Sequence, residues 1–252
     1  MELAKMDQYI RSVELRRDKI SSFSDYPFCL PAIRSLYDLK FHPCVTFIVG
    51  ENGTGKSTVL EAIAVAYGFN PEGGTKNFNF SSNNTHSELF DYIRLSKGVK
   101  RPRDGFFLRA ESLYNVATNI DELDSEGRGP RIIDSYGGRS LHQQSHGESF
   151  MAILMKRLSG RGLYILDEPE AALSPSRQMA MISRMHELVS QDSQLIIATH
   201  SPILMAYPDS VIYEIKDGFQ EVKYEETEHY QITRAFLNNP KKMLDILTGD
   251  EN

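Results

Sequence analysis

Residues 50–57 form the stretch whose residue types most directly indicate chemistry. They read Gly-Glu-Asn-Gly-Thr-Gly-Lys-Ser and satisfy the pattern G-x-x-x-x-G-K-[ST], the Walker A motif. In such a loop the backbone N–H groups turn inward around a polyphosphate, and glycine adopts the required backbone angles without strain. The apolar run 44–49 before the motif predicts a buried strand, and the apolar spacing after it predicts a helix that ends at Gly68. The stretch therefore predicts a nucleoside triphosphate site.

Each polar side chain of this loop has an expected role. Lys56 is predicted to bridge the β- and γ-phosphates, and the Ser57 hydroxyl to bind Mg²⁺. The positive N-terminal end of the helix that begins near Lys56 favours an anion at the same place. The loop residues that we expect to contact ATP are Asn52, Gly53, Thr54, Gly55, Lys56, Ser57 and Thr58.

Two acids and a histidine follow apolar runs further along the chain. The run 162–166 ends in Asp167-Glu168, a Walker B pattern. Asp167 is expected beside Mg²⁺, and Glu168 is expected to polarise the attacking water. His200 follows the apolar run 194–199, where the carboxyl end of a parallel strand places ligand-binding groups. We predict Lys56, Glu168 and His200 as the catalytic residues, with His200 holding the γ-phosphate or the water.

The segment 144–149, Gln-Ser-His-Gly-Glu-Ser, is open to two interpretations. Small residues at a helix N-terminus suit an anion. A capping box, in which Ser145 and a later acid satisfy the first backbone N–H groups of the helix, explains the same residues equally well.

Composition sets broader limits. The chain has 252 residues, with 40% hydrophobic and 25% charged residues and a net charge of −6, which is ordinary for a globular protein. A surface coated with basic residues is excluded, but one local cluster is either a solvated loop or a basic patch. This cluster comprises Lys97, Lys100, Arg101 and Arg103.

The two cysteines, Cys29 and Cys44, show no metal-ligand spacing and fit a reducing compartment, with both thiols expected to be buried. The first seven residues lack the apolar core of a signal peptide. No run approaches the roughly 20 apolar residues that span a bilayer. These features predict a soluble cytoplasmic protein.

Hydrophobic patterning predicts an α/β fold of the P-loop NTPase type, with a mostly parallel sheet flanked by helices. An N-terminal β element is expected at 9–16, a short helix at 87–95, and a hairpin around Asp217-Gly218. We expect a single domain over residues 1–252, with a small inserted subdomain and loops at 69–146. An aromatic side chain could stack on the adenine ring or simply pack in the core; the candidates are Phe23, Tyr26 and Phe28.

Together, these residues resemble the ATP-binding cassette class of P-loop ATPases, including the heads of SMC-like DNA-repair ATPases. The family has Asn-Gly inside its Walker A motif, as at Asn52-Gly53, and a signature L-S-G-G-Q that segment 144–148 partly matches. Residues 171–175 resemble its D-loop, and His200 stands at its switch-histidine position. The chain resembles more closely the small bacterial predicted ATPases of the AAA_21 type, over about residues 9–240. The segments that carry this likeness are 106–111, 145–149, 166–175 and 198–202.

The resemblance implies a homodimer that encloses two ATP molecules, with Ser145 and Gly147 of one copy binding the γ-phosphate held by the other. Two departures weaken this expectation, because His146 replaces the first signature glycine and Ser174 replaces the D-loop aspartate. The family's Q-loop glutamine has no clear counterpart. Glu111, at the end of a predicted strand, is the candidate substitute near the metal.

The resemblance thus implies a Mg²⁺-dependent ATPase that drives or gates a partner such as an effector or a nuclease. Three alternatives stay open: the nucleotide-binding subunit of a transporter with a separate membrane protein, a compact DNA-associated or defence ATPase, and a P-loop kinase. Asp167-Glu168 and the signature-like segment speak against the kinase. A GTPase is disfavoured because the guanine motif N-K-x-D does not occur.

Overall fold

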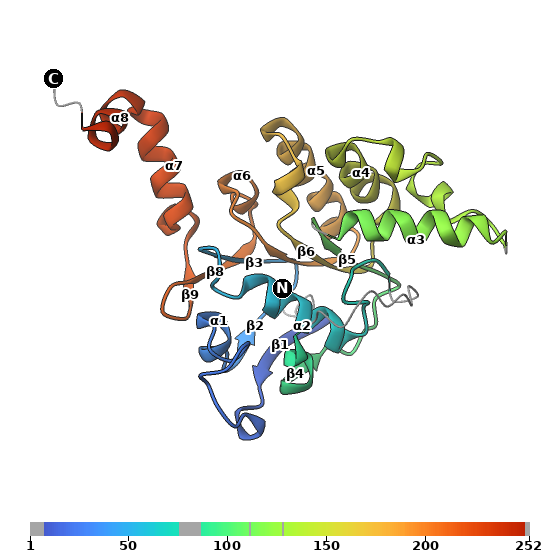
Figure 1. Ribbon diagram of the computed structural model, residues 1–252, viewed down its shortest axis with the longest axis horizontal. Helices are drawn as coiled ribbons and strands as arrows, with labels where there is room; N and C mark the ends of the chain where they lie inside the picture. Colours follow the sequence, from blue (N-terminus) through green and yellow to red (C-terminus); the bar gives the residue numbers. More distant parts are fainter. Residues whose placement is uncertain (1–7, 76–86, 111, 128, 250–252) are drawn as a thin grey trace.

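The fold is built around a six-stranded sheet with strand order β5-β6-β7-β3-β8-β9 (Figure 1). It is seen in a computed structural model that describes residues 8–75, 87–110, 112–127 and 129–249. The strands are β3 (Val45–Gly50), β5 (Asp104–Arg109), β6 (Gly162–Asp167), β7 (Gln194–Ala198), β8 (Ser210–Ile215) and β9 (Phe219–Val222). All neighbours pair in parallel except β8 and β9, which form the predicted hairpin. The predicted α/β class with a mostly parallel sheet is confirmed.

A second, three-stranded sheet contains the N-terminal β element. Strand β1 (Ile10–Leu15) lies between β2 (Leu39–Lys40) and β4 (Ile93–Lys97), and both pairings are antiparallel. The short helix predicted over 87–95 is present only in part, as a 3₁₀ helix at Glu88–Tyr92, because the following residues belong to β4. Pairing of β4 with β1 is a contact between distant parts of the chain, which local residue spacing does not reveal.

The segment 69–146 does not form one inserted subdomain. Its strand β4 belongs to the small sheet and its strand β5 is the edge strand of the central sheet. The chain after β5 is helical, with α3 (Leu113–Ser125) and the 3₁₀ turns Ile132–Tyr136 and Leu141–Gln143. Residues 76–86, where part of the predicted loops would lie, are outside the described residues.

The two faces of the central sheet are covered differently. One face packs against α3, α4 (His146–Ala152), the π-helical turn Ile153–Arg157 and α5 (Pro175–Ser190). The other face packs against α2 (Lys56–Tyr67), α1 (Pro31–Arg34) and the small sheet. Figure 1 shows these layers above and below the sheet. A parallel sheet covered on both sides requires strands that are apolar along their whole length.

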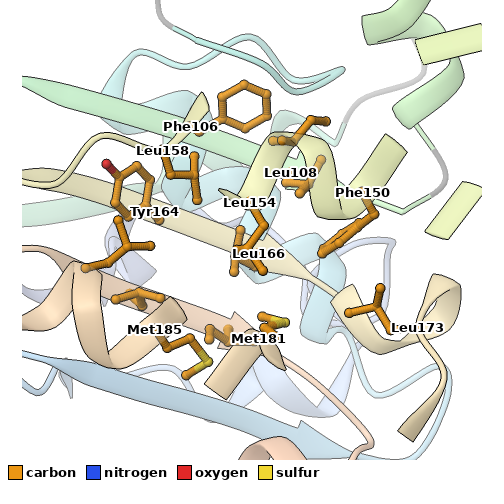
Figure 2. Packing of buried hydrophobic residues seen from close by; sticks show 14 of the residues in the cluster. Phe106, Leu108, Phe150, Leu154, Leu158, Tyr164, Leu166, Leu173, Met181 and Met185 are labelled. Carbon is orange, nitrogen blue, oxygen red and sulfur yellow. The ribbon is translucent and has the colours of Figure 1, made fainter. Parts of the chain in front are cut away.

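Alternation along each strand divides its side chains between these two layers. Tyr164 and Leu166 of β6 enter the layer under α4 and α5, whereas Leu163 and Ile165 enter the opposite one. Figure 2 shows Tyr164 and Leu166 packed with residues of β5, α4, the π-helical turn and α5. The labelled neighbours are Phe106, Leu108, Phe150, Leu154, Leu158, Leu173, Met181 and Met185.

The last two helices stand apart from these layers. The helix α6 (Pro202–Met205) follows β7, and after the hairpin come α7 (Glu228–Asn238) and α8 (Pro240–Thr248). Helices α7 and α8 contain no fully buried residue, and most of their length projects away from the body (Figure 1). No helix of the described residues has the length and apolar character needed to cross a membrane. Cys44 is half-buried, but Cys29 is exposed, so the expectation of two buried thiols is wrong for Cys29.

A single buried amide joins the small sheet to the central one. Gln194, only 1% exposed at the start of β7, accepts hydrogen bonds at Oε1 from the backbone N–H groups of Tyr9 and Ile10, at 3.0 and 2.9 Å. Its Nε2 group donates to the carbonyl oxygens of Ile10 and His42, at 2.8 and 3.0 Å. Every hydrogen-bonding position of this side chain is therefore satisfied by backbone from the N-terminal part of the chain.

We predict that Gln194→Leu lowers the free energy of unfolding by about 3 kcal/mol, because it leaves buried backbone groups without partners, each at a cost of roughly 1–3 kcal/mol. Urea unfolding followed by circular dichroism measures this change. Gln220→Leu, on the exposed edge of β9, is the matched control and is expected to change stability by less than about 0.5 kcal/mol. Equal stability of the two variants would contradict the anchoring role of Gln194.

Candidate active site

The Walker A loop lies between the end of β3 and the start of α2, as the sequence predicts. Gly53 and Gly55 have φ values of 81° and 99°, which glycine adopts at little cost. A side chain at Gly55 would also lie 3.2 Å from Leu30 Cβ. These constraints explain why glycine occupies the position immediately before the helix.

Lys56 is folded back onto the loop that precedes it. Its Nζ donates to the carbonyl oxygens of Gly50 and Glu51, at 2.8 and 3.0 Å, and the residue is only 4% exposed. Burial lowers the pKa of Lys56, while the nearby carboxylates of Glu168 and Asp167 oppose that shift. A buried ammonium needs oxygen partners, and a polyphosphate would supply stronger ones than two carbonyl groups.

Ser57 and Asp167 meet although they are far apart in the sequence. The Ser57 hydroxyl, in the first turn of α2, donates to Asp167 Oδ1 at 3.0 Å. Asp167 is the last residue of β6 and is 6% exposed. The pair thus places a hydroxyl and a carboxylate oxygen next to each other beside the phosphate loop.

Glu168 and His200 complete a cluster at the carboxyl ends of β6 and β7. Glu168 has a left-handed backbone with φ of 49°, and its Oε1 lies 3.4 Å from His200 Nε2. The backbone N–H of His200 donates to Glu170 Oε1 at 2.5 Å. Burial lowers the pKa of His200, and the charge of Lys56 lowers it further. His200 is therefore a neutral imidazole at pH 7.

Arg109 also belongs to this cluster, although no sequence motif marks it. As the last residue of β5 it is in register with Asp167, and its Nε lies 3.8 Å from Asp167 Oδ2. Its Nη1 donates to Glu61 Oε2 of α2 at 2.6 Å. The strand that is predicted to end at Glu111 contained a usable signal for Arg109. Parallel neighbouring strands bring their last residues to the same edge of the sheet, so a charged residue at this strand end is expected near Asp167. Glu111, the residue predicted for this area, lies outside the described residues.

A cavity of about 220 Å³ opens over the phosphate loop. Its lining comprises Tyr26, Leu30, Asn52, Gly53, Gly55, Lys56, Ser57, Thr58 and Glu168. Tyr26 is 67% exposed here, whereas Phe28 packs edge-on against Tyr92 and Phe23 lies under the Arg17 guanidinium. Of the three candidate aromatic residues, Tyr26 is therefore the one placed to meet a base.

Ser145 and Gly147 do not line this cavity within their own chain. The Ser145 side chain accepts from the Glu148 backbone N–H, and Glu148 accepts from the Ser145 backbone N–H, so a capping box is present. Gly147 is buried, and a side chain there would come within 2.5 Å of the Ala172 carbonyl oxygen. The structure thus gives both residues a role in the fold that requires no ligand.

A larger cavity, of about 440 Å³, lies at the opposite edge of the sheet. Its residues Cys44, Arg103, Arg161 and Gln194 stand at or just before the starts of parallel strands. The catalytic candidates stand instead at the strand ends. Size alone does not mark the reaction site here, because the larger cavity contains none of the predicted phosphate-binding residues.

Comparison with known proteins agrees with this geometry. A family described as an AAA domain matches residues 19–145, and one described as an AAA ATPase domain matches residues 143–205. An uncharacterized ABC transporter ATP-binding protein of Haemophilus influenzae is 30% identical over 199 residues, covering 69% of this chain and 71% of that protein. The phosphate import ATP-binding protein PstB 1 of Streptococcus agalactiae is 25% identical over 248 residues, covering 86% and 97%.

Solved structures show the same fold. The structure of cbiO1 from Clostridium perfringens, part of the ABC transporter complex cbiONQ, has a TM-score of 0.50 at 20% identity and covers 93% of this chain and 97% of that one. Both AAA families together extend over the Walker A loop, the Walker B acids and His200. The chain therefore belongs to the AAA-domain P-loop ATPases of the ATP-binding cassette type.

Proposed function

We propose that this ATPase hydrolyses ATP at the cluster formed by Lys56, Ser57, Asp167, Glu168 and His200, and that two copies close around two ATP molecules. The observation that carries the proposal is the meeting of these side chains, from three elements, at the edge of the cavity over the phosphate loop. In this proposal Lys56 exchanges its two carbonyl partners for the β- and γ-phosphates of ATP.

The oxygen atoms beside the loop fit a magnesium ion. Ser57 Oγ and Asp167 Oδ1 are hard ligands 3.0 Å apart, and Mg²⁺ is usually held by one or two carboxylates together with substrate phosphates. No group of three or more histidine, cysteine or acidic side chains suited to a metal occurs among the described residues. When bound, Mg²⁺ would neutralise charge that develops on the phosphate oxygens.

Glu168 is the proposed general base. Its carboxylate would accept a proton from the attacking water as the water oxygen bonds to the γ-phosphorus and the bond to the β-phosphate oxygen breaks. With its backbone held at φ of 49°, Glu168 turns away from the strand and lines the cavity, where a water can be reached. His200, neutral at pH 7, would donate from Nε2 to the γ-phosphate.

Dimer closure would require Ser145 to release its present partner. Its hydroxyl donates to Glu148 Oε2 at 2.7 Å, and the residue is exposed at the start of α4. A γ-phosphate presented by a second copy could replace that carboxylate as acceptor. The resemblance to the cassette family supports this arrangement, and the capping box gives the alternative in which Ser145 acts within its own chain only.

We predict that Glu168→Gln, which cannot accept the proton, retains ATP and accumulates as a dimer, whereas ADP leaves it monomeric. Adding Ser145→Asp is expected to abolish the dimer, because aspartate caps a helix as well as serine but repels the phosphate. Light scattering after size-exclusion chromatography measures both.

The matched control is Ser145→Asn in the same Glu168→Gln background, which keeps a capping side chain without a charge and is expected to dimerise with ATP. Dimerisation without nucleotide, or an ATP-dependent dimer that survives Ser145→Asp, would refute closure through this residue.

The larger cavity, of about 440 Å³ at the starts of the parallel strands, is lined by basic residues and supports a second candidate function, association with nucleic acid. The predicted cluster contributes Lys100, Arg101 and Arg103, and the structure adds Arg161 from the turn before β6. All four are exposed, and Arg103 N–H donates to the Arg161 carbonyl oxygen at 2.9 Å, which holds their backbones together. Such clustering of basic residues on a chain of net charge −6 suits the backbone of a polyanion.

The names of the transporter ATP-binding relatives support the other alternative, a separate membrane protein as partner.

We predict that the protein binds labelled duplex DNA. The double variant Arg101→Glu with Arg161→Glu is expected to bind at least about tenfold more weakly, because with each lost phosphate contact fewer counterions are released from the DNA on binding. Fluorescence anisotropy at several salt concentrations measures the affinity and its salt dependence. Lys241→Glu with Lys242→Glu, on exposed α8, changes the net charge equally and is expected to leave binding unchanged. If wild-type protein binds no DNA, or if both double variants bind alike, this candidate fails.

A further inference from the structure

A second histidine lies behind His200. Nδ1 of His200 and Nε2 of His229 are 2.9 Å apart, and the two rings lie 5.0 Å from centre to centre. On its other side, His200 Nε2 lies 3.4 Å from Glu168 Oε1. The three side chains thus form a row that runs from the proposed general base to the first turn of α7.

The contacts between Glu168, His200 and His229 determine which ring nitrogen of each histidine carries its proton. Burial and the charge of Lys56 lower the pKa of His200, so its ring carries one proton at pH 7. If that proton were on Nδ1, the lone pair of Nε2 would face the Glu168 carboxylate, which is repulsive. With the proton on Nε2, the ring presents its N–H group to Glu168 Oε1, which is 3.4 Å away and too far for a hydrogen bond before ATP binds, and exposes an acceptor at Nδ1.

His229 supplies the matching donor. A proton on its Nε2 gives the N–H group that the 2.9 Å contact with His200 Nδ1 requires. Its own Nδ1 is then a bare lone pair. This agrees with its surroundings, because His229 Nδ1 is buried and has no hydrogen-bond partner among the described residues. A proton placed there instead would be a buried donor without an acceptor, which is costly.

The backbone around His229 is fixed independently of the histidine contact. Thr227, which precedes α7, is fully buried and its hydroxyl donates to the Tyr224 carbonyl oxygen at 2.8 Å. The next residue, Glu228, donates its backbone N–H to the buried Glu214 carboxylate of β8 at 2.8 Å. The first turn of α7 is therefore held to the central sheet, although the rest of α7 projects away (Figure 1).

We infer that His229 is a positioning residue: by donating from Nε2 to His200 Nδ1, it holds His200 in the tautomer that presents an N–H group to Glu168 and to the γ-phosphate of ATP. The inference rests on the role of His200 in the proposed function. It also means that the first turn of α7 takes part in the site, because displacement of His229 would free the His200 ring to change tautomer and orientation.

Two variants separate hydrogen bonding from packing. Glutamine places an amide N–H close to the position of histidine Nε2, so His229→Gln is expected to keep most of the ATPase activity. His229→Leu fills a similar space without a donor and is expected to lower kcat by roughly 10- to 100-fold, as loss of a partner that orients a functional histidine does. ATP affinity should be unchanged in both. His186→Leu, at an exposed histidine on α5 beside Tyr207, is the control for replacing a histidine by leucine away from the site.

The tautomer itself is measured by long-range ¹H–¹⁵N correlation spectra of the seven histidines in the full chain, with the His200 signals assigned by their loss in His200→Leu. We expect the Nε2–H form of His200 in the wild type and in His229→Gln, and a mixture of tautomers in His229→Leu. A His200 proton on Nδ1 in the wild type would overturn the inference, as would an unchanged tautomer in His229→Leu or a glutamine variant as inactive as the leucine one. Full activity of His200→Leu would instead refute the catalytic role of His200, and the wild-type spectrum would still decide the contact with His229.

Discussion

The site depends on the parallel register of β5, β6, β7 and β3. Arg109 is paired with Asp167, Asp167 with Ala198, and Ile48 with Ala198, so the carboxyl ends of four strands stop at one edge. The phosphate loop, the Walker B acids and His200 all come directly after these ends. The two apolar layers hold that register, because a shift of one residue would turn every buried side chain to the wrong face.

Charges of both signs meet at this edge without a nucleotide. Lys56 and Arg109 are the cations, and Glu61, Asp167, Glu168 and Glu170 are the acids around them. Three of these groups have a specific partner: Lys56 donates to the loop carbonyls, Arg109 pairs with Glu61, and Asp167 accepts from the Ser57 hydroxyl. Several of these contacts involve atoms that a metal–triphosphate would engage, so binding would exchange partners rather than create new buried charges.

The sequence predicts the parts of this arrangement that depend on local pattern. The Walker A motif identifies the phosphate loop, and the apolar runs locate the central strands within one or two residues. Ser174 caps α5 with Pro175 in its first turn, as such a pair indicates. The features that it does not predict depend on contacts across the chain: β4 as a strand, β5 as part of the central sheet, and the partners of Arg109. His229 is missed for the same reason, since nothing near it in the sequence marks a contact with His200. At Ser145 the sequence allows both interpretations, and the capping box is present in the structure.

The central claim is that the buried Lys56 ammonium is held ready for the phosphates of ATP. Calorimetric titration of ATP into Lys56→Met tests it most directly, because methionine keeps an unbranched apolar stem and removes only the charge. Lys40→Met, on the exposed side of β2, is the control. We expect Lys56→Met to lose measurable ATP binding while remaining folded, and Lys40→Met to bind as the wild type does. Unchanged ATP affinity in folded Lys56→Met would contradict this claim.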